Sequence, residues 1–222
     1  MINRLSKSKV KSGKSSPSAS QPASASRITT QLEQLHSNDW ATRSTAALEL
    51  GKLGDRQATK ALSAALRDPA AEVARQAAAA LGALRDVSAI EALSAVVVNA
   101  DGYFDGSVRV AAAEALGNLQ DRRAVAALIT VVRDQTAEVS QAAIRALGLL
   151  GDERAIDLLV TVVRNTDNYF LPFVRQTAVE ALTHLSVPSA KESLRRIAAD
   201  SRLDASVRQA AGSALTIANS IN

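Results

Sequence analysis

The sequence offers few side chains of the kinds that perform catalysis or hold metal ions. Histidine, a common proton carrier and metal ligand at neutral pH, occurs twice, at His36 and His184. Neither stands at helical spacing from a second histidine, and the chain has no cysteine. The composition therefore excludes a thiolate metal site, a cysteine nucleophile and a disulfide framework.

The sequence also lacks the usual motifs of enzymes that transfer phosphate or acyl groups. The chain has no Gly-rich phosphate loop and no nucleophile elbow, and its serines concentrate near the N-terminus. We therefore predict no catalytic residues, no metal ligands and no cofactor. A protein that binds a partner is expected rather than an enzyme.

Two acidic segments could be considered for calcium binding. The sequence Asn-Ala-Asp-Gly-Tyr-Phe at 99–104 recurs later in the chain as Asn-Thr-Asp-Asn-Tyr-Phe at 165–170. Each segment offers fewer oxygen ligands than the six to eight that Ca²⁺ takes. Because Asn, Asp and Gly favour tight turns, we predict turns here and no metal site.

Four arginines stand in equivalent positions of a repeated pattern, and together they could form an anion-binding ladder: Arg43, Arg109, Arg175 and Arg208. An arginine in such a position can also pair with a carboxylate of a neighbouring unit or hydrogen-bond to backbone carbonyls. We favour this structural role.

The six aromatic residues all fall just before, or at the start of, predicted helices: Trp40, Tyr103, Phe104, Tyr169, Phe170 and Phe173. Two interpretations of these rings remain open. Aromatic side chains at a loop edge can anchor a protein partner, because they combine a large contact area with a polar group. Alternatively, each aromatic turn folds back as a lid over its own repeat.

These residues sit in a strongly repetitive chain. Leucines that end Ala-Leu or Glu-Leu pairs recur at nearly regular intervals: Leu50, Leu81, Leu116, Leu147, Leu182 and Leu215. At the same distance before five of these leucines stands a valine, and Thr42 takes its place in the first unit. The shared insertions at 99–104 and 165–170 indicate a larger unit made of two repeats, which we call the double repeat.

Each unit has the marks of two helices. Apolar residues in the second helix recur at steps of three and four, as in Val108, Ala112, Leu116 and Leu119. Glycines are then expected to loosen the end of that helix, at Gly51, Gly82, Gly117 and Gly148. Aspartates follow as predicted N-caps of the next helix, at Asp55, Asp86, Asp121 and Asp152. The pair Asp68-Pro69 predicts another N-cap with proline at the first helical position.

The N-terminal segment differs from the repeats. Residues 1–27 are rich in Ser, Lys, Pro and Ala and contain six of the 26 basic residues but no acidic residue. We predict a disordered basic tail at 1–27 and a repeat domain at 28–222. No stretch is apolar enough for a membrane span or a secretory signal, so we expect a cytoplasmic protein.

The repeats resemble a known family. Residues 108–121 and 146–155, with Arg109, Gly117, Asp121, Gly148 and Asp152, are similar to HEAT-like repeats of the phycobilisome-lyase type. The likeness covers residues 38–216 and implies an all-α, right-handed α-solenoid (α/α superhelix) of about five to six helix pairs. Such repeats serve as scaffolds, docking modules and chromophore-lyase subunits. One branch is a di-iron hydroxylase, but it needs His-Glu pairs, which this chain lacks.

In solenoids of this family the second helices line the concave face. The resemblance therefore predicts a partner-binding surface made of the aromatic edge and polar positions on these helices: Trp40, Tyr103, Phe104, Tyr169, Phe170, Phe173, Arg75, Glu114, Arg145 and Glu180. Its mixed charge suits a protein partner better than nucleic acid, which would meet at most the basic tail weakly. The alternative is a phycobilin lyase subunit, for which the partner would be a bilin or a phycobiliprotein.

Overall fold

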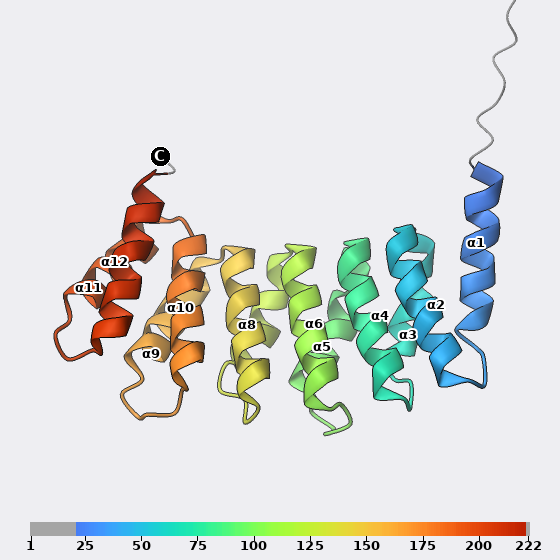
Figure 1. Cartoon of the computed structure of the whole chain (residues 1–222), viewed down its shortest axis with the longest axis horizontal. Coiled ribbons are helices and arrows are strands. Elements are labelled where there is room, and N and C mark those ends of the chain that lie inside the picture. Colours follow the sequence, from blue (N-terminus) through green and yellow to red (C-terminus); the bar gives the residue numbers. More distant parts are fainter. Residues whose placement is uncertain (1–20, 221–222) are drawn as a thin grey trace, which may run out of the picture.

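The computed structural model describes residues 21–220, and this part of the chain is built of twelve α-helices and four short 3₁₀ turns, with no strand (Figure 1). The helices are α1 (Gln21–Gln34), α2 (Trp40–Leu53), α3 (Thr59–Ala65), α4 (Ala71–Leu84), α5 (Ile90–Val98), α6 (Gly106–Leu119), α7 (Val125–Thr130), α8 (Ala137–Leu150), α9 (Ile156–Arg164), α10 (Pro172–His184), α11 (Pro188–Ala199) and α12 (Ala205–Ser220). They form six consecutive pairs, which confirms the predicted α-solenoid.

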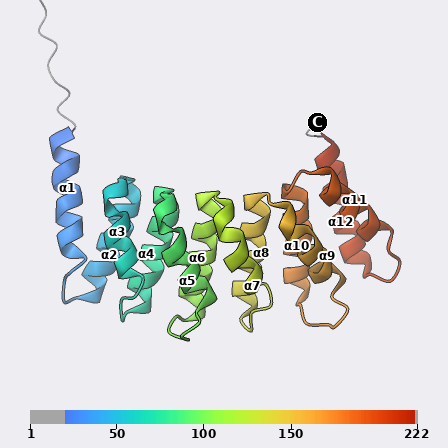
Figure 2. The same ribbon diagram turned by 180° about the vertical axis from the view of Figure 1, so that it is seen from behind.

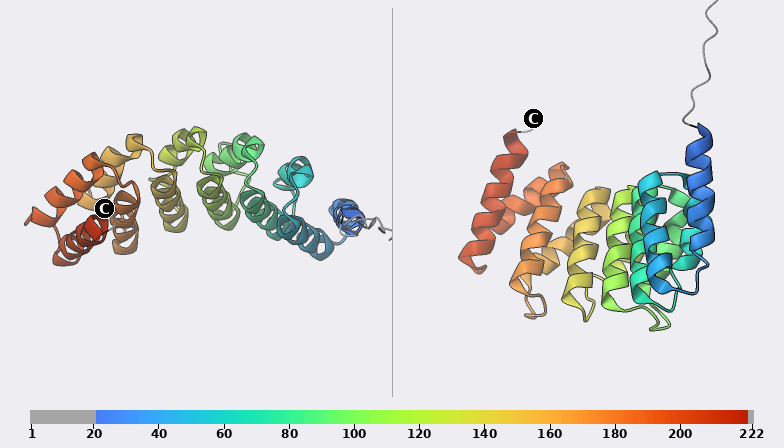
Figure 3. Two further views of the ribbon diagram at one scale, coloured as in Figure 1. Left: turned by 90° about the horizontal axis from the view of Figure 1, so that it is seen from above. Right: turned by 45° about the vertical axis from the view of Figure 1, so that its right-hand side comes forward.

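The helices stand in two rows that curve into an arc. The even-numbered helices contact one another in order, from α2 to α12, and they line the inner side of the arc, whereas α3, α5, α7, α9 and α11 form the outer side (Figure 3). Seen from behind, the shorter outer helices cover the inner row (Figure 2). The predicted assignment of the second helices to the concave face is therefore correct.

The N-terminal helix departs from this scheme. Helix α1 begins at Gln21, so the predicted boundary after residue 27 falls inside a helix. It packs against α2 and stands beside it at the end of the inner row (Figures 1 and 3). Residues 1–20 of the predicted tail lie outside the described residues.

The predicted aspartate caps are present in the structure. Asp55, Asp86, Asp121 and Asp152 each accept a hydrogen bond from the backbone N–H two residues later, at 2.8–3.0 Å. Each opens a 3₁₀ turn that leads directly into an outer helix. Asp68 does not cap a helix as predicted, because α4 begins only at Ala71.

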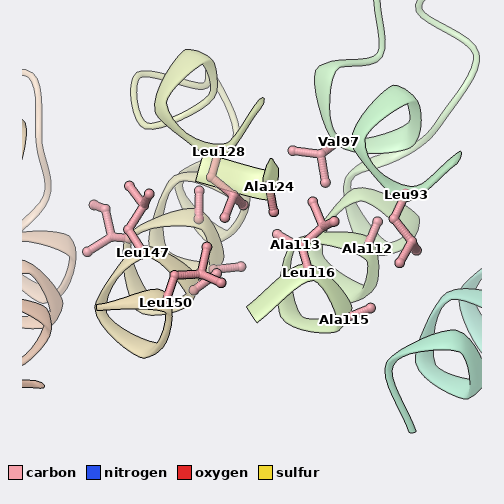
Figure 4. Packing of buried hydrophobic residues seen from close by; sticks show 14 of the residues in the cluster. Leu93, Val97, Ala112, Ala113, Ala115, Leu116, Ala124, Leu128, Leu147 and Leu150 are labelled. Carbon is pink, nitrogen blue, oxygen red and sulfur yellow. The ribbon is translucent and has the colours of Figure 1, made fainter. Parts of the chain in front are cut away.

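The core is a continuous layer of small and branched side chains between the two rows. Leu50, Leu81, Leu116, Leu147 and Leu182, the repeated leucines of the inner helices, are at most 1% exposed. Around them pack alanines of the inner row and apolar residues of the outer row, such as Leu93 and Leu128 (Figure 4). Because each of these leucines is buried between its own pair and a neighbour, its burial stabilises the stacking of units by about 2 kcal/mol.

The repeated glycines have a different role from the predicted one. Gly51, Gly82, Gly117 and Gly148 lie within the inner helices, and each faces an alanine of the next inner helix. A Cβ added at these glycines would stand 2.8–3.1 Å from the Cα of that alanine, closer than non-bonded carbons normally approach. The absence of a side chain therefore sets the distance between successive inner helices, whereas the helix ends are formed by other residues, among them Gly54 and Gly151.

Replacing Gly148 by alanine should destabilise the solenoid. The added methyl would meet the Cα of Ala181 at 2.8 Å, so α8 and α10 must separate, and overpacking of this kind costs about 1–3 kcal/mol. Gly212→Ala in α12 is the matched control, because nothing lies within 4 Å of its added Cβ. That variant should be neutral or more stable. Urea denaturation of both variants checks this, and equal effects would contradict the proposed role of Gly148.

Asp152 should make stability depend on pH. The Arg154 guanidinium, which donates to both oxygens of the Asp152 carboxyl at 2.9 and 2.8 Å, lowers the pKa of this group to about 2. Because the unfolded pKa is higher, about 3.9, this stabilisation is complete above about pH 5 and is lost as the pH falls through about 2. Asp152→Asn should therefore cost about 1 kcal/mol at pH 7 and only a small part of that near pH 2. Denaturation at both pH values measures it, and a constant difference would be the contrary result.

Candidate functional site

Three of the four arginines of the predicted ladder form ion pairs between successive repeats. The Arg43 guanidinium donates to both oxygens of Asp68, at 2.6 and 2.8 Å. Arg109 likewise pairs with Asp134, and N–H groups of Arg109 also bond the carbonyl of Val97 at 2.9 and 3.1 Å. These side chains are engaged within the protein, so the structural role is confirmed for Arg43 and Arg109.

A third ion pair, between Arg175 and Asp204, has the same arrangement and reaches the last repeat. Arg175 bonds Asp204 at 2.5 Å and the carbonyl of Val163 at 3.0 Å. Arg43, Arg109 and Arg175 are equally spaced along the chain, one double repeat apart, which supports this larger unit. Arg208 has no ion pair within the described residues, and its buried Nε has no hydrogen-bond partner there.

The two aromatic turns are closed by the same pair of hydrogen bonds. In the first, the Asn99 side chain donates to the Phe104 carbonyl and accepts from the Phe104 N–H, each at 2.9 Å. Asn165 makes the same two bonds with Phe170, at 2.9 and 2.8 Å. The side-chain oxygens of these asparagines are thus used to shape the turns.

Each aromatic turn is also fastened to the preceding repeat. The Tyr169 hydroxyl lies 2.9 Å from the carbonyl oxygen of Arg133 and 3.0 Å from that of Asp134. The Arg133 guanidinium lies 4.5 Å from the centre of the Tyr169 ring and forms an ion pair with Asp167. Such cation–π and ionic contacts reinforce one another at a partly desolvated surface. We call this arrangement the tyrosine clamp.

The first turn carries a second tyrosine clamp of the same form. The Tyr103 hydroxyl lies 3.1 Å from the Arg67 carbonyl oxygen, and the Arg67 guanidinium stands 5.3 Å from the Tyr103 ring centre and 2.6 Å from the Asp101 carboxylate. In both turns the tyrosine ring meets the neighbouring phenylalanine edge to face at 5.0 Å between centres.

Two of the aromatic residues predicted to lie on the binding surface are buried. Phe104 and Phe170 are only 7% and 6% exposed, because their rings pack into the hydrophobic core, and neither offers a contact surface to a partner. Tyr103 and Tyr169 remain 49% and 41% exposed. The turns are therefore lids that leave one ring of each pair half-exposed.

The other predicted site residues are accessible, but the fold does not bring them into one patch. Trp40 is 53% exposed at the start of α2, and Phe173 is 42% exposed at the start of α10, several helices away (Figure 1). Arg75 pairs with Glu72 on its own helix, whereas Arg145 of α8 reaches across to Glu114 of α6 at 3.8 Å. Glu180 lies farther along the inner row, on α10.

A hollow in the inner row lies between its last two helices. A cleft of about 500 Å³ runs between α10 and α12, and a second hollow of about 550 Å³ continues it towards Pro172 and Phe173. We call the two together the α10–α12 groove. Its floor is apolar, and its rims are polar. Its lining includes Phe173, Val179, Glu180, Ala210, Ser213 and Ile217.

The groove lies where the glycine contact is missing. Thr183 occupies in α10 the place that Gly148 occupies in α8, and the next inner helix presents Ala214 at the place of Ala181. Both Thr183 and Ala214 line the groove. The replacement of glycine by threonine is visible in the sequence, but its consequence depends on a helix contact that the sequence pattern does not reveal.

The described residues 21–220 contain no cluster of three or more histidine, aspartate or glutamate side chains arranged to hold a metal ion. The carboxylate groups that were considered for calcium in the turns are occupied: Asp101 and Asp167 bond Arg67 and Arg133. No helix in this part of the chain is long and apolar enough to span a membrane.

Removal of the Tyr169 hydroxyl should lower stability. Tyr169→Phe loses a hydrogen bond to the preceding repeat, which contributes about 1 kcal/mol. Tyr103→Phe should cost less, because the Tyr103 hydroxyl lies farther from its two carbonyl oxygens, at 3.1 and 3.5 Å. Thermal denaturation of both variants provides the comparison. No loss in either variant would contradict the clamp.

Comparison with known proteins agrees with this architecture. A family model of HEAT repeats matches residues 28–104 and 101–172. The solved complex of CpcE and CpcF of phycocyanin lyase from Nostoc sp. PCC7120 matches with 26% identity and a TM-score of 0.62, over 93% of this chain and 79% of that chain. No curated protein sequence matches the chain.

Two further solved structures share the fold. An archaeal HEAT-like repeat protein from Thermococcus onnurineus NA1 is 18% identical, with a TM-score of 0.55 over 87% of each chain. A designed armadillo repeat protein is 19% identical, with a TM-score of 0.56 over 86% of this chain and all of that chain. With a family model over most of its length and repeats that resemble those of the phycocyanin lyase subunits, the chain belongs to the HEAT repeat family.

Proposed function

We propose that this protein is a scaffold that binds a protein partner through the concave side of its solenoid, with the α10–α12 groove as the main contact site. The observation that carries this proposal is the opening of the inner row at Thr183. The earlier steps between inner helices are closed by glycine. The gap is a concave site of about 500 Å³ next to the exposed side chains of Phe173 and Ile217, and concave sites of this size are common binding sites.

The chemistry of the groove supports binding rather than catalysis. Val179, Ala210 and Ala214 give it an apolar floor, and the exposed Phe173 and Ile217 stand at its two ends. Apolar anchors surrounded by polar rims are typical of protein-binding hot spots. The groove includes His184 and Glu180 but no nucleophile paired with a base.

A second candidate function rests on the structural comparison. The complex that matches this chain consists of two subunits of a phycocyanin lyase. The volume of the groove, about 500 Å³ in its first part, also falls in the range of small-molecule sites. A lyase-related subunit that assembles with a second repeat protein and handles a chromophore is therefore the alternative.

Filling the groove should abolish partner binding. Ala210→Trp places an indole in the groove, whereas Ala95→Trp places one on an exposed position of the outer helix α5 and serves as the matched control. Affinity capture from native lysate with the full chain should retain a protein with the parent and with Ala95→Trp but at least tenfold less with Ala210→Trp. Circular dichroism establishes that both variants keep their helices.

The capture experiment also separates the two candidate functions. Visible absorbance of a pigment in the captured material, lost in Ala210→Trp, would favour the lyase-related alternative. Equal retention of the same protein by all three chains would overturn the assignment of the groove as the binding site.

A further inference from the structure

The charge on the groove wall indicates what kind of segment it takes, an inference that rests on the proposed function. Three glutamates of the inner helices have cationic partners: Glu49 with Lys52, Glu72 with Arg75, and Glu114 with Arg145. Glu180 also lies on an inner helix and lines the groove, but it has no ion pair within the described part of the chain. It is therefore an acidic group of this face that is free to meet a cation from outside.

The repeat symmetry identifies the missing cation. Glu114 on α6 and Glu180 on α10 stand at equivalent places of successive double repeats. Glu114 faces Arg145, which stands six positions after Val139 on the next inner helix α8. The equivalent place on α12, six positions after Val207, holds Ser213. The bridge that joins α6 to α8 has no counterpart in the groove, because a short hydroxyl stands where the guanidinium would be.

The walls of the groove favour a ligand whose backbone is already hydrogen-bonded. Both walls are α-helices, so their backbone N–H and C=O groups are used internally and cannot pair with an extended peptide. An extended segment would leave its own backbone groups against an apolar floor, at a cost of several kcal/mol. A helix satisfies these groups itself. The 13 residues of α10 span about 20 Å at 1.5 Å per residue, which corresponds to about three to four turns of a bound helix.

We propose that the α10–α12 groove binds an amphipathic helix of the partner protein, about three to four turns long, whose apolar stripe covers Phe173, Ala210 and Ile217 and whose lysine or arginine bonds Glu180. The bound cation would take the place that Arg145 holds one double repeat earlier. Apolar residues at positions i, i+4 and i+7 supply the stripe, as in other helix-in-groove complexes.

The experiment uses the full chain and designed peptides of about four helical turns, slightly longer than the groove wall. The probe peptide is helical and carries three leucines on one face with a single lysine beside them. One control peptide has glutamate in place of the lysine, and another has a proline in its centre, which breaks the helix. Fluorescence anisotropy of the labelled peptides gives the dissociation constants.

A charge exchange at Glu180 provides the decisive comparison. Glu180→Lys should weaken binding of the lysine peptide roughly tenfold and should bind the glutamate peptide about as well as the parent binds the lysine peptide. Glu33→Lys, on an exposed position of α1, makes the same change in net charge away from the groove and should leave binding unchanged. The proline peptide should bind at least tenfold more weakly than the lysine peptide.

Several results would overturn the inference. Equal effects of Glu180→Lys and Glu33→Lys would mean that only net charge matters, and equal binding of the proline peptide would exclude a helical ligand. Tighter binding of a peptide of residues 1–20 than of the probe would assign the groove to the basic segment of this chain or of a second copy. If no designed peptide binds although capture of a protein still depends on Ala210, the helix inference fails and the proposed function stands.

Discussion

The close approach of successive inner helices through glycine and alanine is the contact on which the rest of the solenoid depends. A methyl group at any of the four repeated glycines would meet the backbone of the next inner helix, so these positions fix the spacing of the concave face. With this spacing fixed, the repeated leucines from Leu50 to Leu182 are enclosed by their own repeat and the next one. The arrangement explains why alanine dominates the composition and aromatic residues make up only 3%. Large rings would not fit between helices that are packed so closely.

A second set of contacts operates at the edge of the solenoid, with a period of two repeats. The arginine–aspartate pairs join Arg43 to Asp68 and Arg109 to Asp134, and the tyrosine clamps tie each aromatic turn to the repeat before it. The apolar contacts fix how close the repeats lie, whereas the polar contacts fix their relative rotation, because a bidentate guanidinium–carboxylate pair has a defined geometry. The double repeat of the sequence thus corresponds to two kinds of edge contact that alternate along the solenoid, an arginine–aspartate pair at one step and a tyrosine clamp at the next.

The α10–α12 groove lies at the one step between α2 and α12 where the glycine–alanine contact of the inner helices is absent. At the last inner step a threonine stands in place of glycine, and the helices leave a cleft whose apolar floor is continuous with the core. The same step lacks the cation that bridges the inner helices earlier in the chain. Thr183 in place of glycine removes a packing contact, and Ser213 in place of arginine removes an ion pair. Both residues line the α10–α12 groove. The inner row, whose earlier steps are closed by glycine, is therefore open at its last step.

The sequence by itself determined the helix pairs, their approximate number, the capping aspartates and the structural role of the arginines, because these features depend on local periodicity and on pairs of residue types at fixed spacing. It also predicted accessible positions such as Trp40, Phe173 and Glu180. Only the tertiary structure decided that Phe104 and Phe170 are buried, since the direction of a ring in a turn depends on which neighbouring repeat it meets. The true role of the glycines and the existence of the groove likewise required the structure, because both concern the distance between helices of successive repeats, for which local patterns carry no measure.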